Sequence, residues 1–175
     1  MINYNLVRER LKQINKSICD SGFQFEMDTF DILSSQHDLT DVLFYDKSYY
    51  NLKNNLLILV LICDDVCVST ITCNIRDSFI SISSKTHPLH VGKKYNLLLR
   101  STLIMLGGLI RENDKRVSMI KSFATNVASE ASLTKYFDVV HLPDYVFHLT
   151  CDANNKKKAK TLFDEIVIPQ CRCKV

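Results

Sequence analysis

The middle of the chain has the apolar runs and alternation of a small sheet. Residues 56–63, LLILVLIC, are continuously apolar, and residues 66–75, VCVSTITCNI, are rich in β-branched side chains. The acidic pair Asp64 and Asp65 separates the two runs, which predicts a hairpin with a tight turn. Residues 79–85, FISISSK, then alternate apolar residues with serine. The pattern predicts three successive strands that form a meander.

Helical spacing flanks this meander. A first helix over residues 4–19 is predicted by apolar residues near helical spacing: Leu6, Leu11, Ile14 and Ile18. Residues 23–44 mix aromatic residues with Asp and Ser, and permit a strand and a short helix. The helix after Lys94 is apolar almost all round, so it must be buried on more than one side. Gly107 and Gly108 are expected to end it, because two interior glycines would cost about 2 kcal/mol.

The last third of the chain continues this mixture of strands and helices. A short strand ends at Asn126, a helix runs from about Val127 to Phe137, and strands surround Pro143. Residues 155–166 predict a basic amphipathic helix with an apolar stripe: Ala159, Leu162, Phe163 and Ile166. The elements together predict an α+β fold with a mixed, mainly antiparallel sheet flanked by helices.

The composition is that of one compact domain. The chain has 175 residues and is 46% hydrophobic, which is enough for a core. We expect one domain over residues 1–175, with an N-terminal helical and strand region (1–55), a core (56–150) and a C-terminal basic helix and tail (151–175). The net charge of +3 is too small for the strongly basic face of nucleic-acid-binding proteins, so no nucleic acid partner is expected.

The sequence predicts a cytoplasmic protein. The apolar run 56–63 is far shorter than the roughly 20 residues that span a bilayer, so no membrane partner is expected. The first residues, MINYNLVRERLKQ, carry charges where a signal peptide needs an apolar block. The seven cysteines are therefore expected to be reduced thiols. No C-x₂-C pair or His spacing completes a zinc site, and no metal site is predicted.

The turn between the third strand and the apolar helix has the composition of an anion site. Gly92 lets the backbone approach a ligand closely, and Lys93 and Lys94 add two positive charges. The first turn of a helix has unpaired N–H groups and a partial positive charge, so a phosphate ester can bind there. The turn lacks the G-x-x-x-x-G-K-[ST] spacing of a nucleotide P-loop. The two lysines either contact phosphate or lie in solvent.

The order of the predicted elements resembles the GNAT superfamily of acyl-CoA-dependent N-acyltransferases. It is a strand, a basic turn and a helix, followed by a strand, Asn126, a helix and a strand. The resemblance covers residues 56–150, over half the chain. It implies a GNAT-like sheet in which two central strands splay apart, with acetyl-CoA as the cosubstrate. The turn GKKYN followed by LLR resembles a divergent branch among large DNA viruses, which would place the protein in the host cytoplasm or the virion.

In the family, a Q/R-x-x-G-x-G/A segment holds the coenzyme A pyrophosphate with its backbone amides. The best alignment retains Gly92, but Val91 replaces the Arg or Gln, and Lys94 and Asn96 replace the two glycine-like positions. The resemblance therefore implies an altered phosphate turn that binds the cofactor through six residues: Val91, Gly92, Lys93, Lys94, Tyr95 and Asn96.

The resemblance also extends to the second helix. Asn126 begins this helix as an Asn often does in the family, so it either contacts the cofactor or caps the helix. Ser129 likewise either contacts the cofactor or only faces the cleft. Seven residues after that Asn, family members carry a Tyr that protonates the coenzyme A thiolate. This chain has Leu133 there, and Tyr136 follows about one helical turn later, on a similar face.

The implied chemistry is direct attack of an amine on a thioester. Pantetheine would lie in the gap between the splayed strands and bond to strand residues Ser84, Lys85 and Thr86. A backbone N–H would stabilise the oxyanion, and a base would take the proton of the amine. The candidate bases are His87, His90, Asp77 and Glu130. His87 and His90 flank Pro88 in a turn and are either solvated or catalytic.

Two functions follow from the resemblance. The first is an N-acetyltransferase that acetylates a primary amine of a protein or small molecule, with His87 and Tyr136 as catalytic candidates. The second is a catalytically degenerate GNAT-fold protein that binds coenzyme A or another protein. Leu133 and the altered turn favour the second function, whereas the complete strand, turn and helix pattern favours cofactor binding. The acceptor is unknown, and a homodimer is left open.

Overall fold

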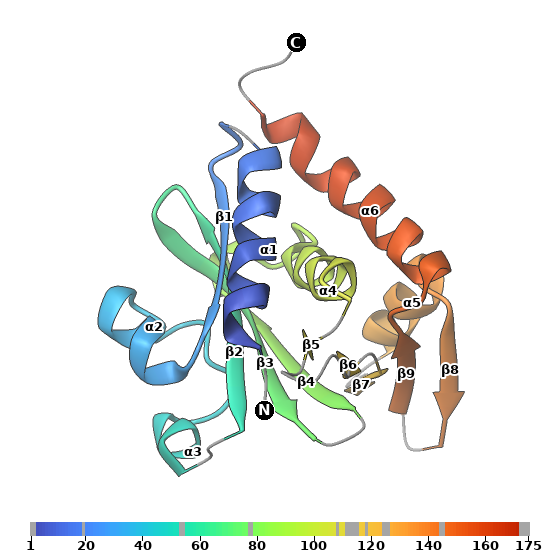
Figure 1. Ribbon diagram of the computed structural model, residues 1–175, viewed down its shortest axis with the longest axis horizontal. Coiled ribbons are helices and arrows are strands. Elements are labelled where there is room, and N and C mark those ends of the chain that lie inside the picture. The colour runs from blue at the N-terminus through green and yellow to red at the C-terminus, as the bar shows by residue number, and fades with distance from the viewer. Residues whose placement is uncertain are drawn as a thin grey trace.

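The protein is an open mixed sheet with helices on both faces (Figure 1). The computed structural model describes residues 3–18, 20–52, 55–76, 79–107, 109–110, 116–117, 119–123, 127–143 and 146–171. In this part of the chain, a seven-stranded sheet has the order β1-β2-β3-β4-β7-β9-β8. The strands are β1 (Phe23–Asp28), β2 (Leu56–Cys63), β3 (Val66–Ile75), β4 (Ile80–Thr86), β7 (Met119–Phe123), β9 (Val146–Thr150) and β8 (Val139–Leu142). Two short strands, β5 (Leu109–Ile110) and β6 (Arg116–Val117), pair separately.

The helices alternate with these strands. They are α1 (Tyr4–Ser17), α2 (Phe30–Gln36), α3 (Lys47–Leu52), α4 (Tyr95–Met105), α5 (Val127–Tyr136) and α6 (Ala153–Val167), with 3-10 turns η1 (Pro88–His90) and η2 (Ile168–Gln170). Among the described residues, none of these helices is long and apolar enough to cross a membrane. The predicted α+β class and the mainly antiparallel sheet are confirmed, since β4 and β7 form the one parallel pair among the described strands.

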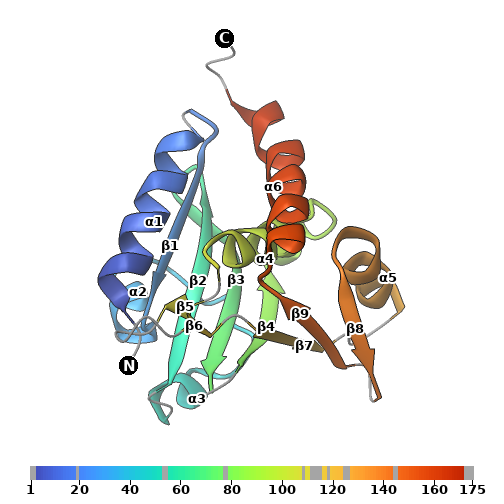
Figure 2. The same cartoon turned by 45° about the vertical axis from the view of Figure 1, so that its right-hand side comes forward.

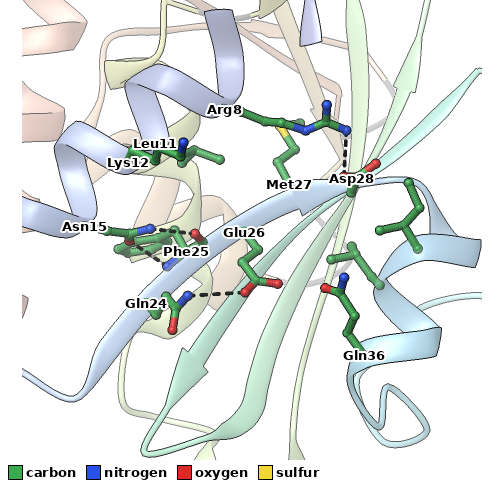
Figure 3. Close-up of a pocket in the computed structure, with 12 residues that line it drawn as sticks. Arg8, Leu11, Lys12, Asn15, Gln24, Phe25, Glu26, Met27, Asp28 and Gln36 are labelled. Atoms are coloured by element: carbon green, nitrogen blue, oxygen red, sulfur yellow. Dashed lines mark hydrogen bonds and ion pairs between the residues drawn. The ribbon is translucent and has the colours of Figure 1, made fainter. Parts of the chain in front are cut away.

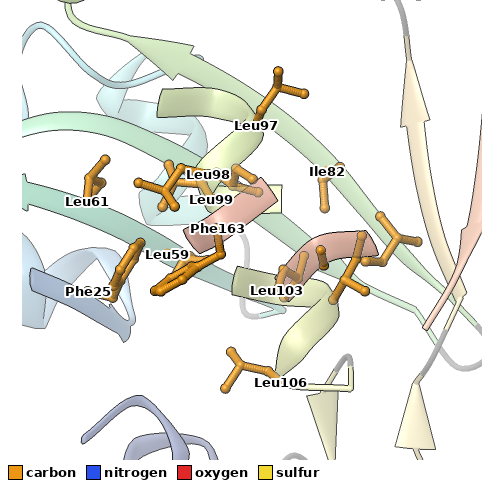
Figure 4. Packing of buried hydrophobic residues seen from close by; sticks show 14 of the residues in the cluster. Phe25, Leu59, Leu61, Ile82, Leu97, Leu98, Leu99, Leu103, Leu106 and Phe163 are labelled. Carbon is orange, nitrogen blue, oxygen red and sulfur yellow. The ribbon is translucent and has the colours of Figure 1, made fainter. Parts of the chain in front are cut away.

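Strand β2 is apolar throughout because both of its faces are buried. Leu57, Leu59 and Leu61 face a core made with α1, α4 and α6, which Figure 4 shows around Phe163. The alternate residues, such as Ile58, face a second core made with α2 and α3. A strand that is buried on both faces has no polar face, so its sequence shows no alternation. The hairpin turn after β2 is also as predicted, because Asp64 and Asp65 have φ of 47° and 68°, the positive values of a type I′ turn.

Helix α4 is buried between the sheet and α6. Five of its apolar residues, Leu97, Leu98, Leu99, Leu103 and Ile104, are at most 4% exposed. The helix ends at Met105, and Gly107 follows with φ of 75°, which confirms the predicted end of this helix. Burial on two sides explains why α4 is apolar almost all round, and it fixes the position of the first turn of α4 above the sheet.

The outer edge of β1 is protected by α1. The Asn15 side chain donates to the carbonyl oxygen of Phe25 and accepts from its N–H, each at 2.9 Å (Figure 3). Arg8 forms an ion pair with Asp28 at 2.9 Å across the same edge. These contacts line a cavity of about 260 Å³ between α1, β1 and α2. The Asn15 hydrogen bonds satisfy backbone groups of Phe25 that an edge strand would otherwise present to another chain.

The pairing of β4 changes partway along the strand. Its first half pairs with β7 through Ile80, Ser81 and Ile82, whereas its second half, from Ser83 to Thr86, continues to pair with β3. Within the described residues, β7 therefore leaves β4 after Ile82, and the two strands diverge in Figure 2. The expected splay of the central strands is present, and it opens at the end of β4 that leads into the basic turn.

Candidate functional site

The turn between β4 and α4 has a backbone that glycine favours. Gly92 has φ of 93° and Lys94 has φ of 62°, both in the left-handed region. A Cβ added at Gly92 would meet no heavy atom within 4 Å, so space lies open beside this residue. Lys94 adopts a conformation that costs a non-glycine residue about 1 kcal/mol. The turn thus keeps the shape of a glycine-containing loop while it carries a cation.

The first turn of α4 leaves its amides available. The first helical hydrogen bond runs from the N–H of Leu98 to the carbonyl of Lys94 at 3.0 Å, and the N-cap residue Lys94 makes no side-chain cap. Helix α6, in contrast, is capped by Asp152, which accepts from the N–H of Asn155 at 2.8 Å. The uncapped N–H groups of α4, its partial positive charge and the two lysines all favour a bound anion.

The side chain of Lys94 reaches from the turn to the end of α5. Its Nζ lies 5.6 Å from the ring centroid of Tyr136, and Lys135 Nζ lies 5.3 Å from the same ring. The hydrogen bond with Lys94 lowers the pKa of Tyr136 below its usual value. Tyr136 and the basic turn are therefore brought together, as the sequence-based hypothesis of a shared site requires.

A basic cavity of about 400 Å³ continues from Tyr136 along α6. It is lined by lysines from two helices, Lys135 of α5 and Lys157 and Lys158 of α6. Lys158 also pairs with Asp138. Glu165 also lines the cavity, and the remaining lysines, Lys135 and Lys157, leave it with a positive charge that suits an anionic ligand, next to the open first turn of α4.

On the α4 side of the sheet, the gap between β4 and β7 contains a buried cation. Ile82 faces the α4 core, so by strand alternation Ser84 faces α4 as well, and Arg100 Nη2 of α4 donates to Ser84 Oγ at 3.3 Å. Arg100 is 8% exposed. Ser122, paired with Ile82 across the start of the gap, is fully buried.

On the opposite face of the sheet, the gap is bordered by aromatic residues between α2 and α3. The hydroxyl of Tyr45 and the Oγ of Ser83 lie 3.0 Å apart. Tyr45 stacks on Tyr49 with ring centroids 4.0 Å apart and packs edge-on against Phe44. The segment between α2 and α3 thus contacts β4 at the residue where the strand loses its pairing with β7.

His87 lies on the rim of an acidic cavity on this second face. The cavity has a volume of about 320 Å³ and is lined by carboxylates of Asp38, Asp41 and Asp65. His87 Nε2 lies 3.6 Å from Asp41 Oδ2, and its Nδ1 accepts from the N–H of Leu89 at 3.2 Å. Because the N–H of Leu89 occupies Nδ1, the neutral imidazole has its proton on Nε2, directed towards Asp41.

His90 has a different environment. Its Nδ1 accepts from Lys93 Nζ at 3.1 Å, and its ring lies 5.6 Å from that of His87. Burial and the nearby charge of Lys93 lower the pKa of His90. Because His90 is held by a residue of the basic turn, His87 is the better placed of the two histidines to act on a molecule in the acidic cavity.

The remaining predicted residues have varied positions. Tyr95 is buried with its ring 5.7 Å from that of Phe23, so its backbone N–H, and not its side chain, is available to an anion. Thr86 Oγ1 lies 2.9 Å from Ser69 Oγ within the sheet. Lys85, Val91 and Asn96 are half-buried or exposed, and Val91 is 72% exposed. Asp77, Asn126 and the side chains of Ser129 and Glu130 lie outside the described residues.

Sequence reasoning missed three residues of this region, Arg100, Tyr45 and Ser83. Arg100 carried one available signal, since it is a single charge within the apolar run LLLRSTLIML. A charge in a helix that must be buried on two sides needs a partner, and that requirement could have singled it out. The contact between Tyr45 and Ser83 joins residues 38 positions apart and had no signal in the sequence.

Comparison with known proteins gives a structural likeness. No protein-family model matches the chain, and no curated protein sequence matches it. Among solved structures, that of the KacTA–DNA complex matches with a TM-score of 0.52 at 12% identity, over 82% of this chain and 99% of that one. The chain has the GNAT fold. The structure of AtaTR bound with AcCoA matches with a TM-score of 0.51 at 10% identity, over 81% of this chain and 98% of that one.

A third match is a mutant of the AtaT toxin bound to the C-terminus of the antitoxin AtaR and acetyl-CoA. Its TM-score is 0.50 at 12% identity, and the match covers 81% of this chain and 97% of that one. The GNAT-like sheet with splayed central strands, expected from the sequence resemblance, is therefore confirmed at the level of the fold. At such low identity, the residues of the site must be argued from this chain's own geometry.

Proposed function

We propose that the protein is an acyl-CoA-dependent N-acyltransferase that transfers an acetyl group from acetyl-CoA to a primary amine. One observation carries the proposal: the uncapped first turn of α4, with Gly92, Lys93 and Lys94, follows directly on the strand that splays from β7. The turn supplies an anion site and the splay supplies exposed strand amides, side by side. The descriptions of AtaTR and AtaT as bound to acetyl-CoA support this cosubstrate.

Three parts of the site would each hold one part of coenzyme A. The amides of the first turn of α4 and the ammonium groups of Lys93 and Lys94 would hold the pyrophosphate. The lysine-lined cavity that begins at Tyr136 would take the 3′-phosphate end, because it is basic and adjoins Lys94. The strand amides of β4 from Ser84 to Thr86 would bind the pantetheine in the gap.

The acceptor amine fits the acidic cavity on the other face. Carboxylates such as Asp38 and Asp41 attract an ammonium group. His87 would take the proton of that group on Nδ1, in place of the hydrogen bond from Leu89, before the amine attacks the thioester carbonyl. Positioning of the two reactants in the gap supplies much of the rate, so the reaction does not depend on a strong acid.

Two roles are compatible with Tyr136. Its place beside Lys94 favours a hydrogen bond to phosphate, whereas the sequence resemblance suggests protonation of the departing thiolate. The Tyr136→Phe variant separates them. A binding role predicts a several-fold rise in the KM for acetyl-CoA with kcat retained. A role as thiol acid predicts a fall in kcat at saturating acetyl-CoA.

The test of the function combines binding with turnover. Gly92→Trp would fill the open space beside the turn, so its acetyl-CoA affinity should fall at least tenfold. Leu89→Trp is the matched control, because Leu89 lies three residues earlier and is 80% exposed. A panel of primary amines, followed by detection of the free thiol, should show turnover in the wild type and Leu89→Trp. Equal acetyl-CoA affinity in both variants would remove the turn from the site.

The second candidate is a coenzyme A-binding module without catalysis. Leu133, a buried residue at the family's thiol-acid position, favours it. This function predicts acetyl-CoA binding that Gly92→Trp abolishes, with no thiol released for any amine tested.

A further inference from the structure

The splayed gap contains a cation, Arg100, that no carboxylate of the described residues neutralises. Arg100 is buried, and burial lowers its pKa to about 10, so it is protonated at neutral pH. Among the described residues, no carboxylate forms an ion pair with it. Its Nη2 donates to Ser84 Oγ at 3.3 Å, and its buried Nε has no hydrogen-bond partner in the described part of the chain. A buried charge without a partner is costly, so such a group points to a ligand.

The polar groups near Arg100 also point to a ligand in the gap. The Oγ of Ser122 is buried without a hydrogen-bond partner among the described residues, on the strand that borders the gap. Ser84 and Ser122 belong to the face of the sheet that α4 covers, since their neighbours Ile82 and Ile120 pack in the α4 core. The α4 side of the gap thus carries a guanidinium and two hydroxyl groups, which are the donors that an oxyanion requires.

An anion bound at Arg100 would be separate from the phosphates assigned to the turn. Arg100 lies five residues after Tyr95, the first residue of α4, which is about 8 Å along the helix axis at 1.5 Å per residue. Its hydrogen bond is to Ser84, inside the gap, two residues beyond the last pair of β4 with β7. Under the proposed function this part of the gap holds the thioester end of the substrate, and an amide or thioester carbonyl there would leave the charge uncompensated.

We infer that the protein accepts acyl-CoA donors whose acyl chain ends in a carboxylate, and that Arg100 binds this carboxylate with Ser84 and Ser122. The inference rests on the proposed function and extends its donor range beyond acetyl-CoA to thioesters of dicarboxylic acids. The carboxylate supplies the charge that Arg100 lacks, and it can accept two hydrogen bonds from a guanidinium in a planar, paired arrangement.

The decisive comparison uses two donors of equal chain length. Succinyl-CoA and butyryl-CoA both carry four-carbon acyl groups. The succinyl group ends in a carboxylate, whereas the butyryl group ends in a methyl group. Isothermal titration of the wild-type protein should show succinyl-CoA binding at least tenfold more tightly than butyryl-CoA. Equal dissociation constants for the two donors, within twofold, would overturn the inference without use of any variant.

A variant pair then assigns the preference to Arg100. Arg100→Met keeps an unbranched side chain without charge, and its dissociation constants for succinyl-CoA and butyryl-CoA should become equal within twofold. Ser101→Ala is the control, because Ser101 is the next residue of the same buried helix and its Oγ also lacks a partner among the described residues. It should keep the wild-type preference. Persistence of the preference in Arg100→Met would overturn the role of Arg100.

The outcomes separate this inference from the proposed function. If acetyl-CoA binds but succinyl-CoA binds no better than butyryl-CoA, the dicarboxylic donor is wrong and the acetyltransferase proposal is unaffected. If none of the three thioesters binds, the proposed function fails, and the inference fails with it.

Discussion

At the scale of single residues, Lys94 combines two roles that oppose each other. Its left-handed backbone costs about 1 kcal/mol relative to glycine, yet its ammonium group extends over the ring of Tyr136 next to the open turn of α4. A strained backbone conformation at a site indicates a function when the residue supplies something that glycine cannot. Lys94 supplies a positive charge.

Replacement of Lys94 by Gly should therefore move stability and affinity in opposite directions. Lys94→Gly relieves the strain, so Tm should rise by about 2–4 °C. The same change removes a cation at the proposed phosphate site, so the dissociation constant for acetyl-CoA should rise roughly tenfold. Differential scanning fluorimetry and isothermal titration measure the two effects.

Lys93→Gly is the matched control. Lys93 has no positive φ, so glycine there relieves no strain and its Tm should stay level or fall. It removes the same charge from the same turn. A fall of Tm in Lys94→Gly as large as that in Lys93→Gly would contradict the strained turn.

Buried thiols should make stability depend on alkaline pH. Burial raises the pKa of Cys73 to about 12, above its unfolded value of 9.0. The stabilisation is fully present below pH 9 and is lost as pH rises from 9 towards 12, because the unfolded thiol ionises first. Between pH 8 and 10.5, urea unfolding should show a loss smaller by about 2 kcal/mol in Cys73→Ala than in the wild type. Equal losses in both proteins would show that Cys73 ionises in the folded state.

The site was predictable from the sequence only where its residues are close together in the chain. Gly92, Lys93 and Lys94 adjoin one another between a strand and a helix, so local pattern was enough to propose an anion turn. Arg100 was passed over because its charge alone says nothing about which strand it reaches. Its contact with Ser84 depends on how α4 lies across the sheet, which is a tertiary property.

At the scale of elements, hydrophobic periodicity predicted the helices and strands that bury either one face or their whole surface. It indicated α1, the β2–β3 hairpin, α4 and α6, because each buries a continuous apolar face or run. It gave no indication of α3, whose sequence KSYYNL has few good helix formers. This helix depends on packing: Tyr50 is 5% exposed, stacks on Phe30, and lies 2.9 Å from Thr72 of β3 through its hydroxyl.

Helix α6 should contribute to stability through its apolar stripe. Phe163 is 1% exposed and its ring lies 5.8 Å from that of Phe25. Phe163→Ala should lower the free energy of unfolding by about 3–5 kcal/mol, since loss of the ring would leave a cavity between α6, β1 and α4. Thr161→Ala, on the exposed side of the same helix, should change it by less than about 0.5 kcal/mol. Chemical denaturation measures both, and similar losses in the two variants would contradict the docking of α6 through Phe163.

At the scale of the whole molecule, the site coincides with an irregularity in the sheet. The antiparallel strands follow from local hairpins, but the β4–β7 pair is parallel and joins strands separated by α4. Periodicity alone did not predict that pairing. The family resemblance implied that two central strands splay apart around Ile82 to Lys85, and in the structure the pairing ends after Ile82. The splay matters because, among the described strands, the edge of β4 beyond Ile82 has no β7 partner, and this edge lies next to the open turn of α4 and beside Arg100.

The central claim is that this turn and this gap together bind an acyl-CoA. Isothermal titration of the purified protein with acetyl-CoA tests it most directly, because it requires no knowledge of the acceptor. The account predicts saturable binding of one molecule per chain in the micromolar range, weakened in Gly92→Trp and unchanged in Leu89→Trp. No binding at millimolar acetyl-CoA would contradict the claim and would mean that the GNAT fold serves another purpose in this protein.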